Sequence, residues 1–423
     1  MDKFIIEGRY ALSGEVSISG AKNAVLPIMA ASLLWPDRYV LHNVPCLHDT
    51  LTMARLMEII GARVVFEHNR MEIDTTACNN PEAPYELVKT MRASFYVLGP
   101  LAGRFGRCRV SLPGGCNWGP RPVDLHLMAM KTLGADITLD GGYIIAKGRL
   151  KGGAINFDTS SVGATGNALM AAVRAEGETV LTNAAREPEI TGLARFLQKM
   201  GARIDGIGTT TLHVTGQKEL HGTEEEIIPD RIEAATFLIA GAMAGDKVKI
   251  NGAREDHLTA LLGKLEAAGV VLKRSDEVIE VSRPSTIQPV DITTAPYPGY
   301  PTDLQAQWIA FMTQAEGSSV VRDEIYLDRF AHVPELARLG ARIRLEGNTA
   351  TVEGPTELIG APVMSTDIRA SASLVLAALV ARGTSEISRV YHLDRGYETI
   401  EKKFAGLGAR IERVAEDHLV QKG

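Results

Sequence analysis

Two kinds of helical pattern alternate with short strand-like patterns along the chain. In the first kind, represented by residues 51–60, apolar side chains recur at helical spacing up to Gly61, where a left-handed helix cap is expected. Residues 62–67 then alternate in polarity, which is typical of a half-buried strand. The second kind is apolar on nearly every side, which predicts a buried helix. Its members are residues 24–34, 165–175, 234–243 and 371–381.

The amphipathic helix, its closing glycine and the following strand recur six times. The glycines are Gly61, Gly134, Gly201, Gly269, Gly340 and Gly408, at intervals of 67 to 73 residues. Self-similarity at a regular interval indicates a repeat architecture, in which each repeat buries its apolar face against its neighbours. Each repeat is predicted to run strand, helix, strand, helix, strand, strand. The predicted fold class is therefore α/β, with six βαβαββ repeats.

The length of 423 residues exceeds what one hydrophobic core supports, so two domains of three repeats each are expected. We predict an N-terminal domain of residues 21–228, which contains the loop 111–122. Residues 1–20 and 229–423 are predicted to form the C-terminal domain.

Some repeats are expected to borrow strands from distant parts of the chain. The last repeat lacks a closing hairpin, so residues 4–7 and 15–19 are expected to join the C-terminal domain. The third repeat is expected to be completed from elsewhere as well. The acidic run Glu224–Glu226, next to the stiffening Pro229, is interpreted as a solvated linker.

Composition and charge exclude several classes of protein. Hydrophobic residues make up 45% and charged residues 23% of the chain, and the net charge of −6 comes without a basic block. These values argue against nucleic acid or an anionic membrane as a partner. The N-terminus does not have the pattern of a signal peptide, so we expect a cytoplasmic protein. Four cysteines without paired spacing argue against a disulfide framework or a zinc site.

The stretch 111–122 has neither helical nor strand periodicity and contains Cys116 and Arg121 among glycines and prolines. One interpretation is a catalytic lid loop in which the nearby arginine favours the thiolate of Cys116. The alternative is a tight turn with an incidental thiol.

Three further stretches suggest anion binding at the beginnings of helices. Lys22 and Asn23 lie where a strand gives way to an apolar helix, so a cation and an amide adjoin free backbone N–H groups. A capped helix with a surface lysine is the alternative. Arg92 opposes the dipole at its helix start and should be balanced by an anion. Asp303 follows a proline loop at a helix start, where it could be an ordinary cap or a general base.

Three arginines in the C-terminal half each lie near an aspartate. Arg329, Arg369 and Arg395 are interpreted as occupying equivalent loops of three repeats, which would bring them to one end of the domain. Converging arginines repel one another unless an anion lies between them, and guanidinium groups favour carboxylate and phosphate. The pattern therefore predicts a small ligand that carries both groups.

The chain resembles the UDP-N-acetylglucosamine 1-carboxyvinyltransferases of the enolpyruvyl transferase family over essentially its whole length. The most specific matching segments are Ser19–Asn23, Leu112–Cys116, Arg121–Asp124, Ser161–Thr165, Pro301–Asp303, Thr366–Arg369 and Asp394–Tyr397. The resemblance implies two inside-out α/β barrels of three βαβαββ units each. The related enolpyruvyl transferase of the shikimate pathway shares the repeat but lacks the cysteine loop.

The resemblance also implies a reaction. The enolpyruvyl group of phosphoenolpyruvate would pass to the 3-hydroxyl of UDP-N-acetylglucosamine by addition and elimination, with release of phosphate. This is the first committed step of peptidoglycan synthesis. Both implied partners are small molecules, and neither a cofactor nor a metal is implied. The oligomeric state is left open.

Residue roles follow from the same resemblance. Lys22, Arg121 and Arg395 would hold the phosphate of phosphoenolpyruvate, and Arg329 and Arg369 would hold its carboxylate, with Asn23 close by. Asp303 would accept the proton of the sugar hydroxyl, and Cys116 would protonate the methylene carbon. The implied catalytic residues are Lys22, Cys116, Asp303 and Arg395. The implied UDP-sugar site consists of Asn23, Arg92, Arg121, Pro122, Val123, Asp124, Leu125, Thr159, Ser160, Ser161, Val162, Gly163, Asp303 and Ile325.

Three alternatives stay open from the sequence. A repeat of this kind could form a ring-shaped DNA clamp, although its inner helices would then be basic rather than apolar. A binding-only relative would be expected to lack Cys116, Asp303 or Arg395, all of which are present. A different acceptor alcohol is the third alternative, because Thr159 stands where some family members carry a lysine toward the nucleotide.

Overall fold

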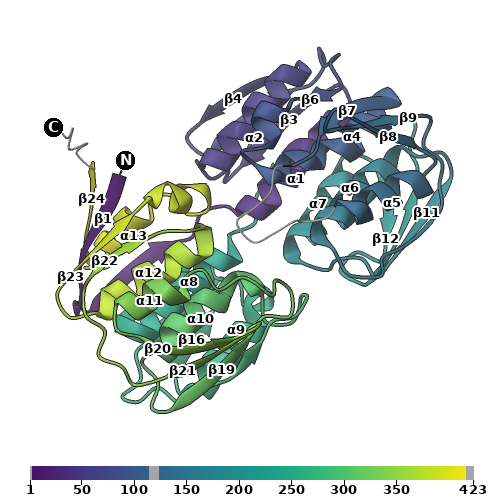
Figure 1. Ribbon diagram of the computed structural model, residues 1–423. Coiled ribbons are helices and arrows are strands. Elements are labelled where there is room, and N and C mark those ends of the chain that lie inside the picture. Colours follow the sequence, from purple (N-terminus) through teal and green to yellow (C-terminus); the bar gives the residue numbers. More distant parts are fainter. Residues whose placement is uncertain (1, 114–122, 416–423) are drawn as a thin grey trace, which may run out of the picture. The chain divides into compact units, whose positions relative to one another are not determined.

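The computed structural model describes residues 2–113 and 123–415. Contacts divide the chain into two compact units (Figure 1). The N-terminal unit comprises Gly20–Ile228, and the C-terminal unit comprises Met1–Ser19 with Pro229–Gly423. Gly20, which the sequence analysis grouped with the C-terminal segments, thus packs with the N-terminal unit. A Cβ atom at this position would lie 1.8 Å from the carbonyl oxygen of Asn43, so only glycine allows this close approach.

Each unit contains three four-stranded sheets among its described residues. In every sheet the first two strands are parallel, and the third strand pairs antiparallel with the second and the fourth. In the N-terminal unit the sheets are β14(Glu224–Glu226)–β3(Arg38–His42)–β5(Arg70–Asp74)–β4(Arg63–Glu67), β6(Glu82–Ala83)–β7(Arg107–Ser111)–β9(Tyr143–Lys147)–β8(Asp136–Asp140) and β10(Ala154–Asn156)–β11(Glu178–Thr182)–β13(Thr211–Thr215)–β12(Arg203–Asp205).

The C-terminal unit repeats this pairing pattern. Its sheets are β2(Leu12–Ser17)–β15(Gly245–Asn251)–β17(Val278–Ser282)–β16(Val271–Ser275), β18(Ile292–Thr293)–β19(Ser318–Arg322)–β21(Thr349–Glu353)–β20(Arg342–Glu346) and β22(Pro362–Met364)–β23(Thr384–Ser388)–β1(Asp2–Glu7)–β24(Arg410–Ala415). The N-terminal β1 therefore supplies the third strand of the last sheet.

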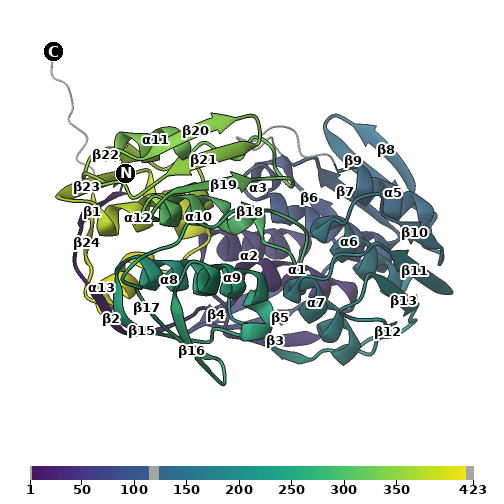
Figure 2. The same cartoon turned by 90° about the horizontal axis from the view of Figure 1, so that it is seen from below.

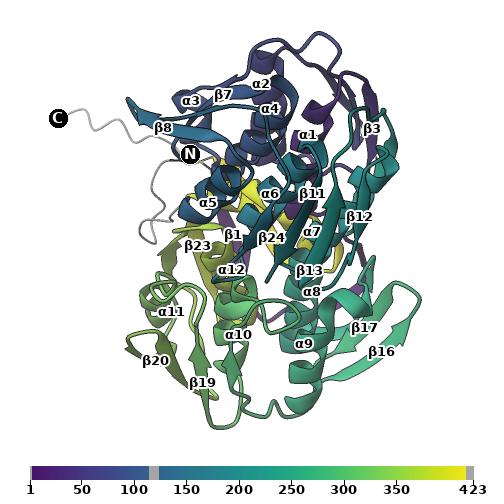
Figure 3. The same cartoon turned by 90° about the vertical axis from the view of Figure 1, so that its right-hand side faces the viewer.

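Apolar helices form the interior of each unit, as the sequence pattern predicts. In the C-terminal unit α8, α10 and α12 pack against one another, and α10 lies beside α12 in Figures 2 and 3. In the N-terminal unit α4 packs against α6. These apolar helices are α1(Lys22–Ala31), α4(Leu98–Phe105), α6(Val162–Arg174), α8(Arg231–Ala244), α10(Gln305–Met312) and α12(Ile368–Val380). Each unit is thus an inside-out α/β barrel, with helices inside and sheets outside.

The amphipathic helices follow the second strand of each repeat and end at the repeat glycines. Those glycines have φ between +87° and +109°, a conformation that disfavours a side chain. The helices are α2(His48–Ile60), α5(Asp124–Thr132), α7(Pro188–Lys199), α9(Glu255–Ala267), α11(Val333–Arg338) and α13(Ile400–Gly406). Shorter helical turns are η1(Ser32–Leu34), α3(Tyr85–Val88), η2(Arg92–Val97), η3(Thr302–Leu304) and η4(Val390–Arg395). Among the described residues, no helix is both long and apolar enough to cross a membrane.

Two sequence-based expectations about strand exchange are wrong. Glu224–Glu226 is not a linker: it forms β14, which pairs in parallel with β3 and completes the first sheet. Its alternating exposure shows how an acidic run can be a solvated edge strand. The third repeat needs no borrowed strand, because its sheet is built from residues 154–215. Within the N-terminal unit, the first repeat is therefore the one completed by a distant segment.

Candidate active site

An aspartate stands at or just before the start of each inner helix of the C-terminal unit. Asp230 and Asp367 are conventional caps, and each accepts two backbone N–H groups of the first turn of its helix, at 2.8–3.1 Å. Asp303, in η3 before α10, makes no capping hydrogen bond. The sequence allowed either an ordinary cap or another role for this residue, and the geometry excludes the cap.

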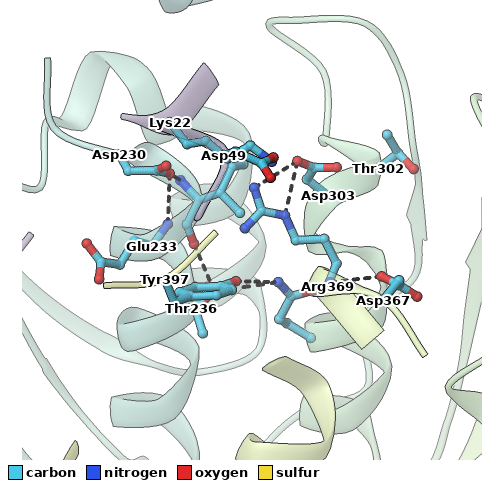
Figure 4. A network of polar contacts seen from close by, with 12 residues as sticks. Lys22, Asp49, Asp230, Glu233, Thr236, Thr302, Asp303, Asp367, Arg369 and Tyr397 are labelled. Atoms are coloured by element: carbon cyan, nitrogen blue, oxygen red, sulfur yellow. Dashed lines mark hydrogen bonds and ion pairs between the residues drawn. The ribbon is translucent and has the colours of Figure 1, made fainter. Parts of the chain in front are cut away.

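The carboxylate of Asp303 is instead bound by two arginines. Its Oδ1 lies 2.8 Å from Nη1 of Arg329. Its Oδ2 lies 3.0 Å from Nη2 and 3.1 Å from Nε of Arg369 (Figure 4). Burial by itself would raise the pKa of the Asp303 carboxyl, but the guanidinium groups of Arg369 and Arg329 outweigh it and hold the pKa well below its usual range. The carboxylate is therefore ionised, and the cluster carries two cations for one anion.

Arg369 is buried among polar groups, and one of its guanidinium nitrogens makes no hydrogen bond to the described residues. Its side chain is 4% exposed, and its guanidinium lies 5.4 Å from the ring centroid of Tyr397. The Tyr397 hydroxyl lies 2.9 Å from the hydroxyl of Thr236 (Figure 4). Among the described residues, Nη1 of Arg369 has no hydrogen-bond partner although it is buried. An unsatisfied buried guanidinium donor is costly, and an anionic ligand would satisfy it.

The three arginines do not occupy equivalent positions, contrary to the sequence-based expectation. Arg329 follows β19 and Arg395 ends η4 after β23, but Arg369 lies in the first turn of α12. The arginines also do not form ion pairs in the way that their nearness to aspartates in the sequence suggested. Asp394 pairs with Arg413, and Asp303 comes from a separate element to join two arginines.

In the N-terminal unit Lys22 forms a nearly buried ion pair at the start of α1. Its Nζ lies 3.0 Å from Oδ2 of Asp49, and the side chains are 12% and 2% exposed. Asp49 lies in the first turn of α2, where the helix dipole also favours its negative charge. Lys22 was predicted from the sequence, whereas Asp49 was not.

A neutral hydrogen-bonded network connects other predicted residues of this unit. Asn167 on α6 accepts the N–H of Gly99 with Oδ1 at 2.8 Å, and its Nδ2 lies 2.9 Å from Nδ1 of His126 on α5. Because Nδ2 can only donate, Nδ1 of His126 accepts and the ring proton is on Nε2. Burial, with a further contribution from Arg92, lowers the pKa of His126 to about 3, so the imidazole is neutral.

The same histidine lies against the predicted nucleotide loop. A Cβ atom at Gly163 would come within 3.1 Å of Nε2 of His126, so the first turn of α6 packs directly on the ring. His126 thus contacts Gly163, and the charge of Arg92 lowers its pKa; both are among the predicted UDP-sugar residues. Neither His126 nor Asn167 was predicted from the sequence.

The remaining predicted residues are distributed over both units. Asn23 is the second residue of α1, Val123 precedes α5, and Asp124 and Leu125 lie in its first turn. Thr159 and Ser160 lie in the loop before α6, Ser161 caps that helix through the N–H of Ala164, and Val162 begins it. Ile325 lies in the loop after β19. Cys116, Arg121 and Pro122 lie outside the described residues.

Within residues 2–113 and 123–415, no three His, Cys, Asp or Glu side chains gather as metal ligands would.

The family model of EPSP synthase (3-phosphoshikimate 1-carboxyvinyltransferase) matches residues 6–404. A UDP-N-acetylglucosamine 1-carboxyvinyltransferase of Chlorobaculum parvum is 57% identical over 98% of both chains. Its counterpart in Chloroherpeton thalassium is 56% identical over 100% of this chain and 99% of its own. The chain belongs to this enolpyruvyl transferase family. It is accordingly a transferase, and its curated relatives of 53–57% identity carry the UDP-N-acetylglucosamine name.

Solved structures of enolpyruvyl transferases share the architecture. The enolpyruvyl transferase NikO from Streptomyces tendae superposes with a TM-score of 0.90 at 26% identity, over 98% of this chain and 99% of its own. EPSP synthase from Acinetobacter baumannii gives a TM-score of 0.77 at 18% identity, which bears on the fold alone. These neighbours confirm the predicted fold class.

Proposed function

We propose that this enolpyruvyl transferase moves the enolpyruvyl group of phosphoenolpyruvate to the 3-hydroxyl of UDP-N-acetylglucosamine and releases phosphate. The acceptor is inferred from the relatives of 53–57% identity that bear this name over nearly their full length. Phosphoenolpyruvate as donor fits the excess of cationic side chains around Asp303, because that molecule carries a carboxylate and a phosphate.

The observation that carries the proposal is the position of Asp303. It stands at a helix start like Asp230 and Asp367, yet it accepts from two guanidinium groups and not from its helix. A carboxylate in this setting is ionised but weakly basic. If the carboxylate of phosphoenolpyruvate shares Arg329 and Arg369, each guanidinium stabilises Asp303 less and the pKa of Asp303 rises. Donor binding would thus turn Asp303 into a stronger base for the sugar hydroxyl.

The proposed reaction has two stages. In the addition, a proton from Cys116 goes to the methylene carbon, the 3-hydroxyl oxygen bonds to the adjacent carbon, and Asp303 takes the hydroxyl proton. In the elimination, the methyl carbon returns a proton to the Cys116 thiolate, the double bond re-forms, and the bond to phosphate breaks as the phosphate leaves. A positioned general acid and a positioned general base each increase the rate of such a reaction by about 10²–10⁴-fold.

The phosphate of the donor is assigned to Lys22, Arg121 and Arg395 in this proposal. Asp49 would orient the Lys22 ammonium, since the two groups are 3.0 Å apart and nearly buried. The UDP-sugar is assigned to the segments around Arg92, Val123–Leu125 and Thr159–Gly163, with Ile325. Because nucleotide sugars and phosphoenolpyruvate are cytoplasmic metabolites, we further propose a cytoplasmic enzyme that opens peptidoglycan synthesis.

Phosphate release tests the proposal. Purified protein is given phosphoenolpyruvate and UDP-N-acetylglucosamine together and each alone. The proposal predicts release only when both are present. Release with a different acceptor alcohol and none with this sugar nucleotide would overturn the acceptor assignment. Binding of the sugar nucleotide without release under any condition would instead indicate a binding-only relative.

A further inference from the structure

One position recurs in the repeats directly after the second strand of a sheet. In the first and third repeats it holds Asn43 and Asn183. The side-chain amide of each asparagine donates a hydrogen bond to a backbone carbonyl just beyond the neighbouring parallel strand, that of Ile227 or Phe157, at 2.8 Å. An asparagine here therefore ties two parallel strands together at their ends.

The fifth repeat holds an aspartate, Asp323, at this position, and the direction of hydrogen bonding is reversed. The side chain is fully buried and only accepts. Its Oδ1 accepts from the hydroxyl of Thr294, just beyond the parallel strand β18, at 2.7 Å and from the backbone N–H groups of Ile325 and Tyr326 at 2.9 Å each. Its Oδ2 accepts from the hydroxyl of Thr302 at 2.7 Å.

These contacts continue directly to the candidate active site. The Thr302 hydroxyl donates its single hydrogen to Asp323. Its oxygen therefore accepts a hydrogen bond from Nη1 of Arg329, at 3.0 Å. The same guanidinium nitrogen lies 2.8 Å from Oδ1 of Asp303. Asp323 therefore fixes the hydroxyl that, together with Asp303, determines where the Arg329 guanidinium lies.

Asp323 holds a second element of the site through the backbone. The N–H groups of Ile325 and Tyr326 bind the same carboxylate oxygen, which anchors the start of the loop that leads to Arg329. Ile325 is assigned to the sugar nucleotide and Arg329 to the carboxylate of phosphoenolpyruvate. One buried carboxylate thus supports residues proposed for both substrates.

We propose that Asp323 is a positioning residue for both substrates: it orients Arg329 through Thr302 and holds the Ile325 backbone. The inference rests on the function proposed above. A carboxylate is required because four donors converge on this side chain. An asparagine amide has only one accepting oxygen, so its nitrogen would face either the Thr302 hydroxyl or the two backbone N–H groups.

The repeat itself supplies the test substitution. Asp323→Asn introduces the residue that two equivalent positions already contain, so the strand ends are expected to remain tied and the protein to fold. Asp323→Glu restores a carboxylate and serves as the conservative rescue. Asp291→Asn is the matched control, because Asp291 is an exposed aspartate of the same sheet that accepts from the N–H of Val320 at 2.7 Å.

Steady-state kinetics of phosphate release and thermal unfolding are measured for all four proteins. We expect Asp323→Asn to raise the KM of both substrates and to lower kcat/KM by about 10- to 100-fold, because small displacements of positioning groups have effects of this size. Asp291→Asn should match the wild type, and Asp323→Glu should recover part of the loss.

Three results separate the possible failures. Equal kinetics for Asp323→Asn and Asp291→Asn would overturn the positioning role. So would a fall in kcat that follows the folded fraction while both KM values stay unchanged, since that marks a structural role. If the wild type releases no phosphate, the proposed function itself fails.

Should Asp323→Asn not fold, Thr294→Val provides a second test, because it removes one donor to the Asp323 carboxylate. It is expected to raise the KM values of both substrates by a smaller factor. Unchanged KM values in that variant would overturn the positioning role.

Discussion

The two units use the same repeat to build polar centres of opposite character. In the C-terminal unit Asp303, Arg329 and Arg369 form an ionised cluster around the starts of α10 and α12. In the N-terminal unit His126 and Asn167 form a network without net charge beside the start of α6. The difference shows that the fold determines where polar groups gather. The residue types at those positions determine whether the centre is ionised or carries no net charge.

This contrast assigns different parts of the proposed reaction to the two centres. An ionised cluster with an unsatisfied guanidinium donor suits a small dianion and a proton transfer. A neutral network that packs against the first turn of α6 suits the orientation of a larger ligand by hydrogen bonding and shape. Substitutions in the ionised cluster should therefore change turnover and donor binding, and those in the neutral network should change acceptor affinity.

The largest effect is expected from Asp303→Asn. The amide keeps the shape but cannot accept the hydroxyl proton, so kcat should fall by about 10³-fold, within the range of general-base removal. Phosphate release by the folded protein is the measurement. Asp276→Asn, in the exposed turn between β16 and β17, is the control. A kcat within threefold of the control would show that Asp303 is not the base.

Arg369→Lys should have the next largest effect. Lysine cannot reproduce the paired donation from Nε and Nη2 to Asp303 while leaving another donor free. A loss of about 2 kcal/mol is expected for such a charged hydrogen bond, which corresponds to a roughly thirtyfold rise in the KM for phosphoenolpyruvate. Arg322→Lys, at an exposed position of β19, should leave this KM unchanged. A rise confined to the KM for the sugar nucleotide would reverse the assignment of the two centres.

His126→Gln tests the neutral network. Glutamine cannot accept from Asn167 and meet Gly163 in the same way, so the KM for UDP-N-acetylglucosamine should rise by about tenfold, equivalent to about 1.4 kcal/mol for one buried hydrogen bond. The KM for phosphoenolpyruvate and kcat should stay near their wild-type values. His213→Gln, on an exposed position of β13, is the matched control. An unchanged KM for the sugar nucleotide would remove His126 from this role.

The smallest effect concerns stability and pH. The pKa of His126 is near the ordinary histidine value of 6.5 in the unfolded chain, and burial lowers it to about 3 in the folded protein. Below pH 6.5 the imidazole is protonated in the unfolded chain but not in the folded protein, which favours unfolding. The stability of the protein with a neutral His126 is therefore complete above pH 6.5 and decreases as the pH falls from 6.5 towards 3. Between pH 7 and 5.5 the loss should be about 1 kcal/mol, measured by urea unfolding. His126→Gln should lack this component, and an identical pH dependence in both proteins would contradict the buried neutral imidazole.

The sequence predicts the repeat well because its signals are local. Helical periodicity, an apolar inner helix and a glycine such as Gly61 at positive φ are all determined within one repeat. The strand β14 escaped prediction because three consecutive glutamates have no apolar pattern, and only pairing with β3 makes them a strand. Long-range pairing of this kind leaves no local trace.

The candidate site is less predictable for the same reason. Asp303 could be proposed from its position at a helix start and Arg369 from its nearness in sequence to an aspartate, but their mutual contact joins residues 66 positions apart. Asp49, His126 and Asp323 were missed because nothing local distinguishes them from surface residues. Their signal is burial of a polar group, which becomes visible only in the folded chain.

The identity of the acceptor is the central claim, and one competition experiment tests it most directly. The protein is given phosphoenolpyruvate with equal concentrations of UDP-N-acetylglucosamine and 3-phosphoshikimate, the acceptor in the name of the matching family model. The products are identified by mass spectrometry. We predict that only the sugar nucleotide gains an enolpyruvyl group, with one phosphate released per product molecule. Enolpyruvyl transfer to 3-phosphoshikimate, with the sugar nucleotide recovered unchanged, would contradict the account.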